Sequence, residues 1–185
     1  MIKNISTLLI MYVSLTLASF SFAVDSSTKD FSLPNHGSLS LTFPSSWKDN
    51  IRQPPDQLPP TITMETEGKN TFQMLLTPIW PAKKDMPQQS LATIKTNVQN
   101  AANHAASQAV ENSIPLKEIT GNSIQGYYFS ATDKAPKPGE YKYMTQGTLQ
   151  LNELTIPFTI LSNDGGETDV SNALNMLKVM KHNAP

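Results

Sequence analysis

The side chains that could carry metal or acid–base chemistry are few and scattered along the chain. The three histidines, His36, His104 and His182, show no His-x3-His or Glu-x-x-His spacing, which is the spacing that places two ligands side by side on a helix. A metal site would have to be assembled wholly by the fold. Met176 and Met180, with His182, could offer soft ligands to copper, but core packing is the better interpretation of both methionines. We expect no metal and no cofactor.

Oxygen-rich segments offer two further possibilities. Residues 163–169, Asn-Asp-Gly-Gly-Glu-Thr-Asp, could suit calcium, but they lack the alternating ligands and distal Glu of an EF-hand loop. A turn followed by acidic residues explains the segment without a metal, because those charges interact favourably with a helix N-terminus. Glu65 and Glu67 could form an acid and base pair of the glycosidase type, although alternate solvent-facing strand positions are ordinary for Glu. Hydrolase, P-loop and dinucleotide motifs are absent from the sequence, so we predict that the protein is not an enzyme.

Aromatic residues in the C-terminal half are the candidates for protein contact. They lie on two neighbouring predicted strands, and two of the four must point away from the core: Tyr127, Tyr128, Tyr141 and Tyr143. Tyrosine supplies a large contact area with a polar tip, and the alternative is plain cross-strand packing. Nucleic acid is not an expected partner, because the net charge is −1 and the fourteen basic residues include a single arginine, Arg52.

The first 23 residues have the pattern of a secretory signal peptide. Lys3 precedes an apolar stretch that ends at Ser21-Phe22-Ala23, which predicts cleavage after Ala23. The alternative is an uncleaved anchor, since residues 5–22 approach the length that spans a bilayer. The chain has no cysteine, which excludes disulfides and the anchored form of a bacterial lipoprotein. We therefore expect a periplasmic or secreted protein whose mature chain does not insert into a membrane.

The mature sequence predicts a flexible N-terminal arm over residues 24–37, because they lack a sustained apolar period, and a single domain over 38–185. Alternation predicts a strand at 38–43 and a hairpin at 61–77. Trp47 is expected to cover the core. The stretch 53–60 is too rich in proline for a helix or a central strand.

Residues 88–110 carry apolar side chains at three-four spacing and predict a long amphipathic helix. Further strands are predicted, with a tight turn at Asn152-Glu153 and a final helix beginning near Thr168. These strands cover residues 116–120, 123–132, 140–151 and 154–162. Pro157 indicates an edge position or a bulge in the last of them. The sum is an α+β fold in which a mostly antiparallel sheet is packed between helices, an α/β/α sandwich.

The order of these elements resembles the PsbP/Mog-like group and its bacterial DcrB-like relatives over about residues 38 to 182. The residues that carry the resemblance are Leu-Ser-Leu-Thr-Phe-Pro-Ser-Ser-Trp at 39–47 and Gly-Tyr-Tyr-Phe at 126–129. That group contains accessory and binding proteins, among them a photosystem subunit and a Ran-binding protein, and it transfers no catalytic residue. The chain departs from the lipid-anchored bacterial members because it has no lipobox cysteine.

The resulting hypothesis is a non-catalytic extracytoplasmic binding or accessory protein whose partner is another protein of the bacterial envelope. The sequence leaves the oligomeric state open. The alternative is a small-ligand carrier or a small secreted enzyme with a pocket between the long helix and the sheet.

Overall fold

The computed structural model describes residues 25–185 except 57, 68–70 and 83–86, so the predicted leader at 1–23 lies outside the described part. The two helices are α1 (Leu91–Ala106) and α2 (Glu167–Val179). The strands are β1 (Ser26–Ser32), β2 (Ser38–Pro44), β3 (Trp47–Arg52), β4 (Thr61–Thr66), β5 (Phe72–Leu76), β6 (Lys117–Gly121), β7 (Ile124–Thr132), β8 (Tyr143–Leu151), β9 (Leu154–Ser162) and β10 (Lys181–Asn183). Among the described residues, no helix has both the length and the apolar character needed to cross a bilayer.

The strands form two antiparallel sheets. The large sheet has the order β3-β4-β5-β9-β8-β7-β6, and the small sheet has the order β1-β2-β10. Long hairpins join β7, β8 and β9 in continuous register. The predicted tight turn between β8 and β9 is confirmed, and Asn152 adopts a φ of 51° there, a left-handed conformation that asparagine tolerates.

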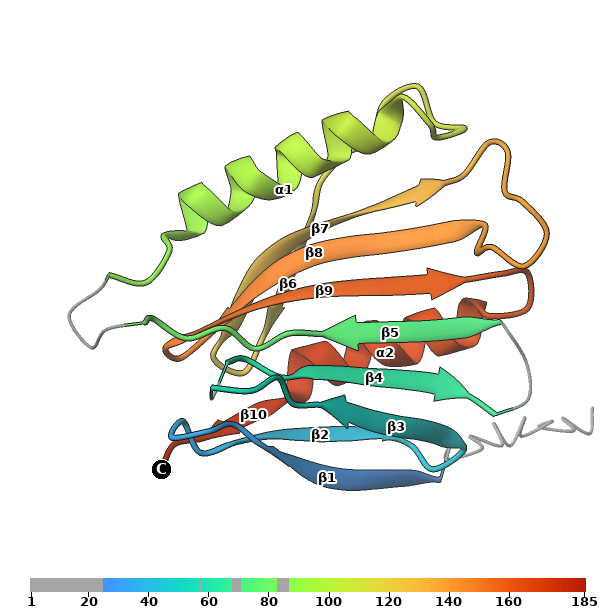
Figure 1. Ribbon diagram of the computed structural model, residues 1–185. Helices are drawn as coiled ribbons and strands as arrows, with labels where there is room; N and C mark the ends of the chain where they lie inside the picture. The colour runs from blue at the N-terminus through green and yellow to red at the C-terminus, as the bar shows by residue number, and fades with distance from the viewer. Residues whose placement is uncertain (1–24, 57, 68–70, 83–86) are drawn as a thin grey trace, which may run out of the picture.

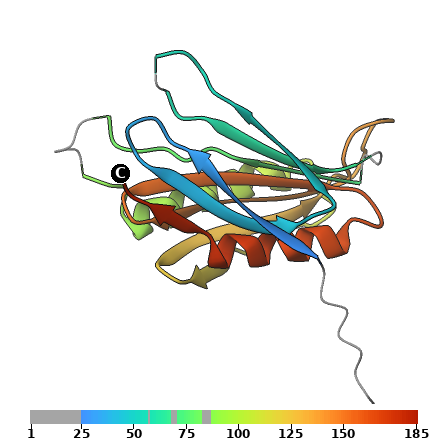
Figure 2. The same ribbon diagram turned by 90° about the horizontal axis from the view of Figure 1, so that it is seen from below.

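Each face of the large sheet contributes to a separate core. One face packs against α2 and the small sheet, with α2 lying on the opposite side of the sheet from α1 (Figures 1 and 2). The larger buried side chains of this first core are Leu39, Leu41, Ile62, Met64, Phe72, Met74, Leu76 and Phe158. The second core lies under α1 and consists of Ile94, Val98, Ala102, Ile114, Phe129 and Ala131.

Helix α1 covers only part of its face of the sheet. Ser90 caps the helix, because its Oγ accepts a hydrogen bond from the Thr93 N–H at 3.1 Å. The helix is shorter than the predicted 88–110 and ends at Ala106, after which the Val110 N–H donates to the Thr132 carbonyl. It packs mainly on β7 and β8, so the same face of β5, β4 and β3 has no helix over it (Figure 1).

The mostly antiparallel α+β architecture is confirmed, and Trp47 covers the core as predicted. Its side chain is buried, its ring centroid lies 4.5 Å from that of Phe72, and its Nε1–H donates to Asp169 Oδ1 at 2.9 Å. The small three-stranded sheet was not predicted, so a single sheet between two helices does not describe the molecule completely.

The predicted flexible arm at residues 24–37 is wrong for most of its length. Residues 26–32 form β1 and pair with β2 along the whole strand, and Phe31 and Leu33 are buried in the core. The interpretation failed because β1 is an edge strand with one apolar side chain. Its position depends on backbone pairing with β2, which leaves no hydrophobic period in the sequence.

Pro157 does not mark an edge or a bulge, because β9 lies between β5 and β8 in the sheet. The Thr77 N–H donates to the Pro157 carbonyl at 3.2 Å. A strand residue directs its nitrogen and its carbonyl to the same side, so the missing N–H of the proline faces the end of β5, where regular pairing stops at Leu76. A central strand tolerates the proline there because a single donor is lost just beyond the regular ladder, and pairing resumes at the bridge between Ile79 and Thr155.

Candidate ligand-binding pocket

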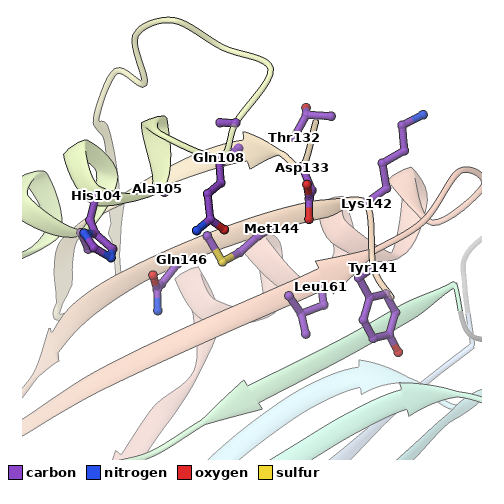
Figure 3. Close-up of a pocket in the computed structure, with 13 residues that line it drawn as sticks. His104, Ala105, Gln108, Thr132, Asp133, Tyr141, Lys142, Met144, Gln146 and Leu161 are labelled. Carbon is purple, nitrogen blue, oxygen red and sulfur yellow. The ribbon is translucent and has the colours of Figure 1, made fainter. Parts of the chain in front are cut away.

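A pocket with a volume of about 430 Å³ lies between the C-terminal half of α1 and the ends of β7, β8 and β9 (Figure 3). The helix and the turn after it contribute Ala101, His104, Ala105, Gln108 and Ala109. The sheet and its connecting segment contribute Ala131, Thr132, Asp133, Tyr141, Lys142, Met144, Gln146 and Leu161. The volume is in the range of sites that bind a small ligand or one or two side chains of a partner.

Small side chains on α1 create this space. Ala101 and Ala105 lie four residues apart on the same side of α1 and line the pocket, and Ala109, in the turn after the helix, lines it as well. Met144 and Leu161 are register partners on β8 and β9 and form the apolar floor. The helix therefore lies over the sheet without filling the volume beneath its last turns.

The rim is held by hydrogen bonds behind the pocket. The Glu111 carboxylate accepts from the N–H of Thr132 at 2.9 Å and from its hydroxyl at 2.7 Å. Burial alone would raise the pKa of Glu111, but the hydrogen bonds from Thr132 outweigh it, and the pKa is lowered. The Asp133 N–H donates to the Lys142 carbonyl, and Asp133 Oδ1 accepts from the Ala135 N–H.

Two side chains on the rim carry polar groups, and the Tyr141 hydroxyl points toward the open sheet whereas Lys142 points away from it (Figure 3). Burial, followed by the negative charge of Glu65, raises the pKa of Tyr141, so its hydroxyl is neutral and can donate at physiological pH. Lys142 forms an ion pair with Asp164 at 3.2 Å. The hydrogen bonds of Lys142 to Tyr143 and Asp164 raise its pKa.

The floor of the pocket continues across the uncovered face of the sheet. The register extends the row from Met144 and Leu161 to Gln73 on β5, Glu65 on β4 and Lys48 on β3. A ligand bound on Met144 and Leu161 could therefore extend over the polar side chains of this row, because no helix covers that part of the sheet. The arrangement suits a group with an apolar end and hydrogen-bonding capacity beyond it.

The four predicted tyrosines are not brought together. Tyr127 packs on the α1 side, with Lys95 Nζ 5.2 Å from its ring centroid. Tyr128 packs on the opposite side, where its centroid lies 6.5 Å from that of Phe158.

The other two tyrosines precede or begin β8 but have different surroundings. Tyr143 donates from its hydroxyl to Asp164 Oδ1 at 2.6 Å. Among the four predicted residues, Tyr141 is the one in the lining of the described pocket. Tyr127 and Tyr128 pack on opposite faces of the sheet and Tyr141 lines the pocket, and a binding role for any of the four tyrosines stays a prediction.

Several pocket residues were not singled out from the sequence. His104 is exposed and lies at the rim. The alanine spacing was the available signal, but alanine lines close-packed and open interfaces alike. Among the described residues, no group of three or more His, Asp or Glu side chains is placed to hold a metal ion.

Comparisons with known proteins show the fold. Neither a family model nor a curated protein matches the chain. Among solved structures, it is similar to the solution structure of cyanobacterial PsbP (CyanoP) from Synechocystis sp. PCC 6803, with a TM-score of 0.51 and 6% sequence identity. The match covers 91% of this chain and 99% of that one. The chain therefore has a PsbP-like fold, which supports the resemblance to that group; the narrower resemblance to DcrB-like proteins stays a prediction.

Proposed function

We propose that the protein is a non-catalytic binding or accessory protein that acts outside the cytoplasm and holds a segment of another envelope protein in the pocket beside α1. The observation that carries the proposal is the pocket itself, which opens onto the uncovered face of the large sheet. The N-terminal pattern supports the compartment, and the PsbP-like fold supports an accessory role because the resembling group contains accessory and binding proteins.

The chemistry of the lining supports binding rather than catalysis. The floor is apolar, the helical wall is mostly alanine, and the Asp133 carboxylate already accepts a backbone hydrogen bond in its own turn. These groups can bury an apolar side chain and hydrogen-bond to the backbone around it. The pocket lining contains a single imidazole, that of His104, and it is exposed.

The next rows of the open face fit an extended partner segment. Register places Gln146 opposite Thr159, Thr159 opposite Leu75, and Leu75 opposite Thr63. These side chains are half-buried and uncharged, and three of the four carry amide or hydroxyl groups. A peptide that crosses the strands would meet hydrogen-bonding partners on this row and an apolar recess beside it.

Photo-cross-linking tests the proposal. A photo-reactive amino acid replaces Gln108 at the pocket rim in one variant and Asn103 in the control. Both residues are exposed, but Asn103 is not part of the pocket lining. In cells of the native host, we expect one envelope protein to be captured from position 108 and not from position 103. Equal capture from both positions, or none from position 108, contradicts the proposal.

A small-ligand carrier is the second candidate, and the same 430 Å³ volume favours it because the pocket lies where that alternative placed it. Native mass spectrometry of protein purified from the host distinguishes the two. A co-purified small molecule that leaves on denaturation, together with no cross-link from position 108, would favour the carrier.

A further inference from the structure

Away from the pocket, three ionisable side chains from distant parts of the chain meet at the end of the molecule where the C-terminus lies (Figure 1). His36 lies between β1 and β2, Glu153 in the β8–β9 turn, and His182 in β10. His182 Nδ1 is 3.5 Å from Glu153 Oε2, and His36 Nδ1 is 4.0 Å from Glu153 Oε1. One carboxylate therefore faces two imidazoles.

The hydrogen bonds of His182 fix which of its nitrogens carries a proton. Its side chain has 0% exposed area, and Nε2 lies 2.8 Å from the carbonyl oxygen of His36. A carbonyl only accepts, so Nε2 must donate. In the neutral imidazole, Nδ1 then carries a lone pair directed at the Glu153 carboxylate, and two acceptors face each other.

The Nδ1 atom of His182 has no hydrogen-bond partner among the described residues, although it is fully buried. A buried polar atom without a partner is costly. A proton on Nδ1 gives this buried atom a hydrogen-bond partner and also ends the contact between two acceptors, because the imidazolium can donate to Glu153 Oε2. Glu153 is a turn side chain with 42% exposure, so a small movement closes the gap to hydrogen-bond distance.

Glu153 is within ion-pair distance of both His182 and His36. β2 places Leu39 opposite His182 in register. The segment after β5 contributes Trp80, whose ring is stacked on that of His36 with centroids 4.5 Å apart. Neither of these neighbours titrates, so the local charge balance depends on the three members of the cluster.

The cluster lies where the small sheet meets the β8–β9 turn. β10 is three residues long and pairs with β2 on one side. Gly37, with a φ of 72°, lies directly against the backbone of Asn183, where a β-carbon would collide with the Asn183 carbonyl oxygen. The Asn183 amide contacts Ser38 Oγ at 3.3 Å. At this end Glu153 faces both histidines, and Trp80 stacks on His36.

We propose that His36, Glu153 and His182 form a proton-operated latch. Uptake of a proton by His182 ties β10 and the small sheet to the β8–β9 turn, and loss of that proton loosens the C-terminal strand. The latch is closed while the imidazole is protonated and the carboxylate is ionised. It opens when the imidazole loses its proton. The inference is independent of the pocket beside α1.

Hydrogen exchange of residues 180–185, corrected for intrinsic rates, tests the latch at pH 5.5 and pH 8.0. The variants are His182→Gln and Glu153→Gln, and His104→Gln is the matched control because His104 is an exposed histidine on α1. In the wild type and in His104→Gln, we expect local opening to increase about fivefold at pH 8.0, as one charge-assisted hydrogen bond at a partly exposed site allows. Neither latch variant should show the increase.

Two results would overturn the latch. The first is a wild-type protein with no difference between the two pH values, or a Glu153→Gln variant that keeps the full difference; Glu153→Gln decides the question even where His182→Gln fails to fold. The second is a pH effect that disappears when a chelator is added, because a bound metal ion would then replace the proton as the third partner.

Discussion

The two faces of the seven-stranded sheet differ in how completely they are covered. On one face, α2 and the small sheet bury a continuous core in which Ile62, Met64 and Met74 have no exposed area. On the other face, α1 covers mainly β7 and β8 and leaves a pocket under its alanines. The first face therefore carries most of the stability of the fold, and the second has surface available for a ligand.

The same kind of side chain has different surroundings on the two faces. Met74 is fully buried opposite Met64, whereas Met144 is half-buried on the pocket floor. Among the aromatic residues, Trp47 and Phe72 are in contact in the first core, whereas Tyr141 lies at the pocket rim. Phe129 is buried under α1 in the second core. Sheet position decides the role of a residue more than its type.

The largest expected effect is on the closed face. Trp47→Ala should lower the free energy of unfolding by about 3–5 kcal/mol, because it removes a buried ring and the hydrogen bond to Asp169. Urea unfolding measures the loss, with Trp80→Ala as the control because Trp80 is only partly buried. Equal losses from the two tryptophans would contradict the assignment of Trp47 to the centre of stability.

A methionine pair tests the difference between the faces directly. Met74→Ala should cost about 2–5 kcal/mol, because it leaves a cavity in a closed core. Met144→Ala should cost about 1 kcal/mol or less, since the site is already open to solvent. Parallel urea titrations of both variants give the comparison, and the reverse order would show that the face under α1 is the more tightly packed.

Asp169→Ala should lower the free energy of unfolding by about 1–2 kcal/mol. The substitution leaves the buried Trp47 N–H without its acceptor and removes an acidic group from the first turn of α2. Glu167→Ala, in the same turn, is the control for the helix charge alone. Thermal unfolding of the two variants separates the contributions, and identical shifts in Tm would exclude a specific role for the hydrogen bond.

The smallest expected effect is the pH dependence of Glu111. Because the folded pKa of Glu111 is lowered, its contribution is present above the unfolded pKa and is lost as the pH falls through the folded pKa. The group is half-buried at the surface, so solvent screening limits the contribution to under about 1 kcal/mol. Urea unfolding at pH 7 and under acid conditions measures the difference in stability between wild type and Glu111→Gln. We expect this difference to be smaller in acid. A difference that grows in acid would contradict a lowered pKa of Glu111.

The regular elements could be predicted from the sequence because their signals are local. Alternation and three-four spacing identified β2, β7, β8, β9 and both helices, with end points shifted by a few residues. β1 and β10 could not be predicted this way. β1 has a single apolar residue and β10 spans three residues, so both depend on pairing with β2 rather than on a pattern of their own.

The sites depended on contacts that no local pattern contains. His36 and His182 are 146 residues apart and show no ligand spacing in the sequence, yet the fold places them around Glu153. The pocket was anticipated as an alternative between the long helix and the sheet, but its lining depends on where α1 stops and how far it lies from β8. The position of Pro157 could not be predicted from its own strand either. A central strand accepts this proline because the regular pairing of the neighbouring β5 ends beside it.

The central claim is that the half-covered face binds a partner and the closed face does not. Leu161→Gln places an amide on the pocket floor, and Val179→Gln makes the same change at a residue of α2 that is 51% exposed and lies outside the pocket beside α1. With the photo-reactive residue at position 108 in both variants, we expect Leu161→Gln to reduce cross-linked partner at least about tenfold, as the loss of one buried apolar contact implies, and Val179→Gln to leave the yield unchanged. An unchanged yield in Leu161→Gln, or a loss in Val179→Gln alone, would contradict the claim.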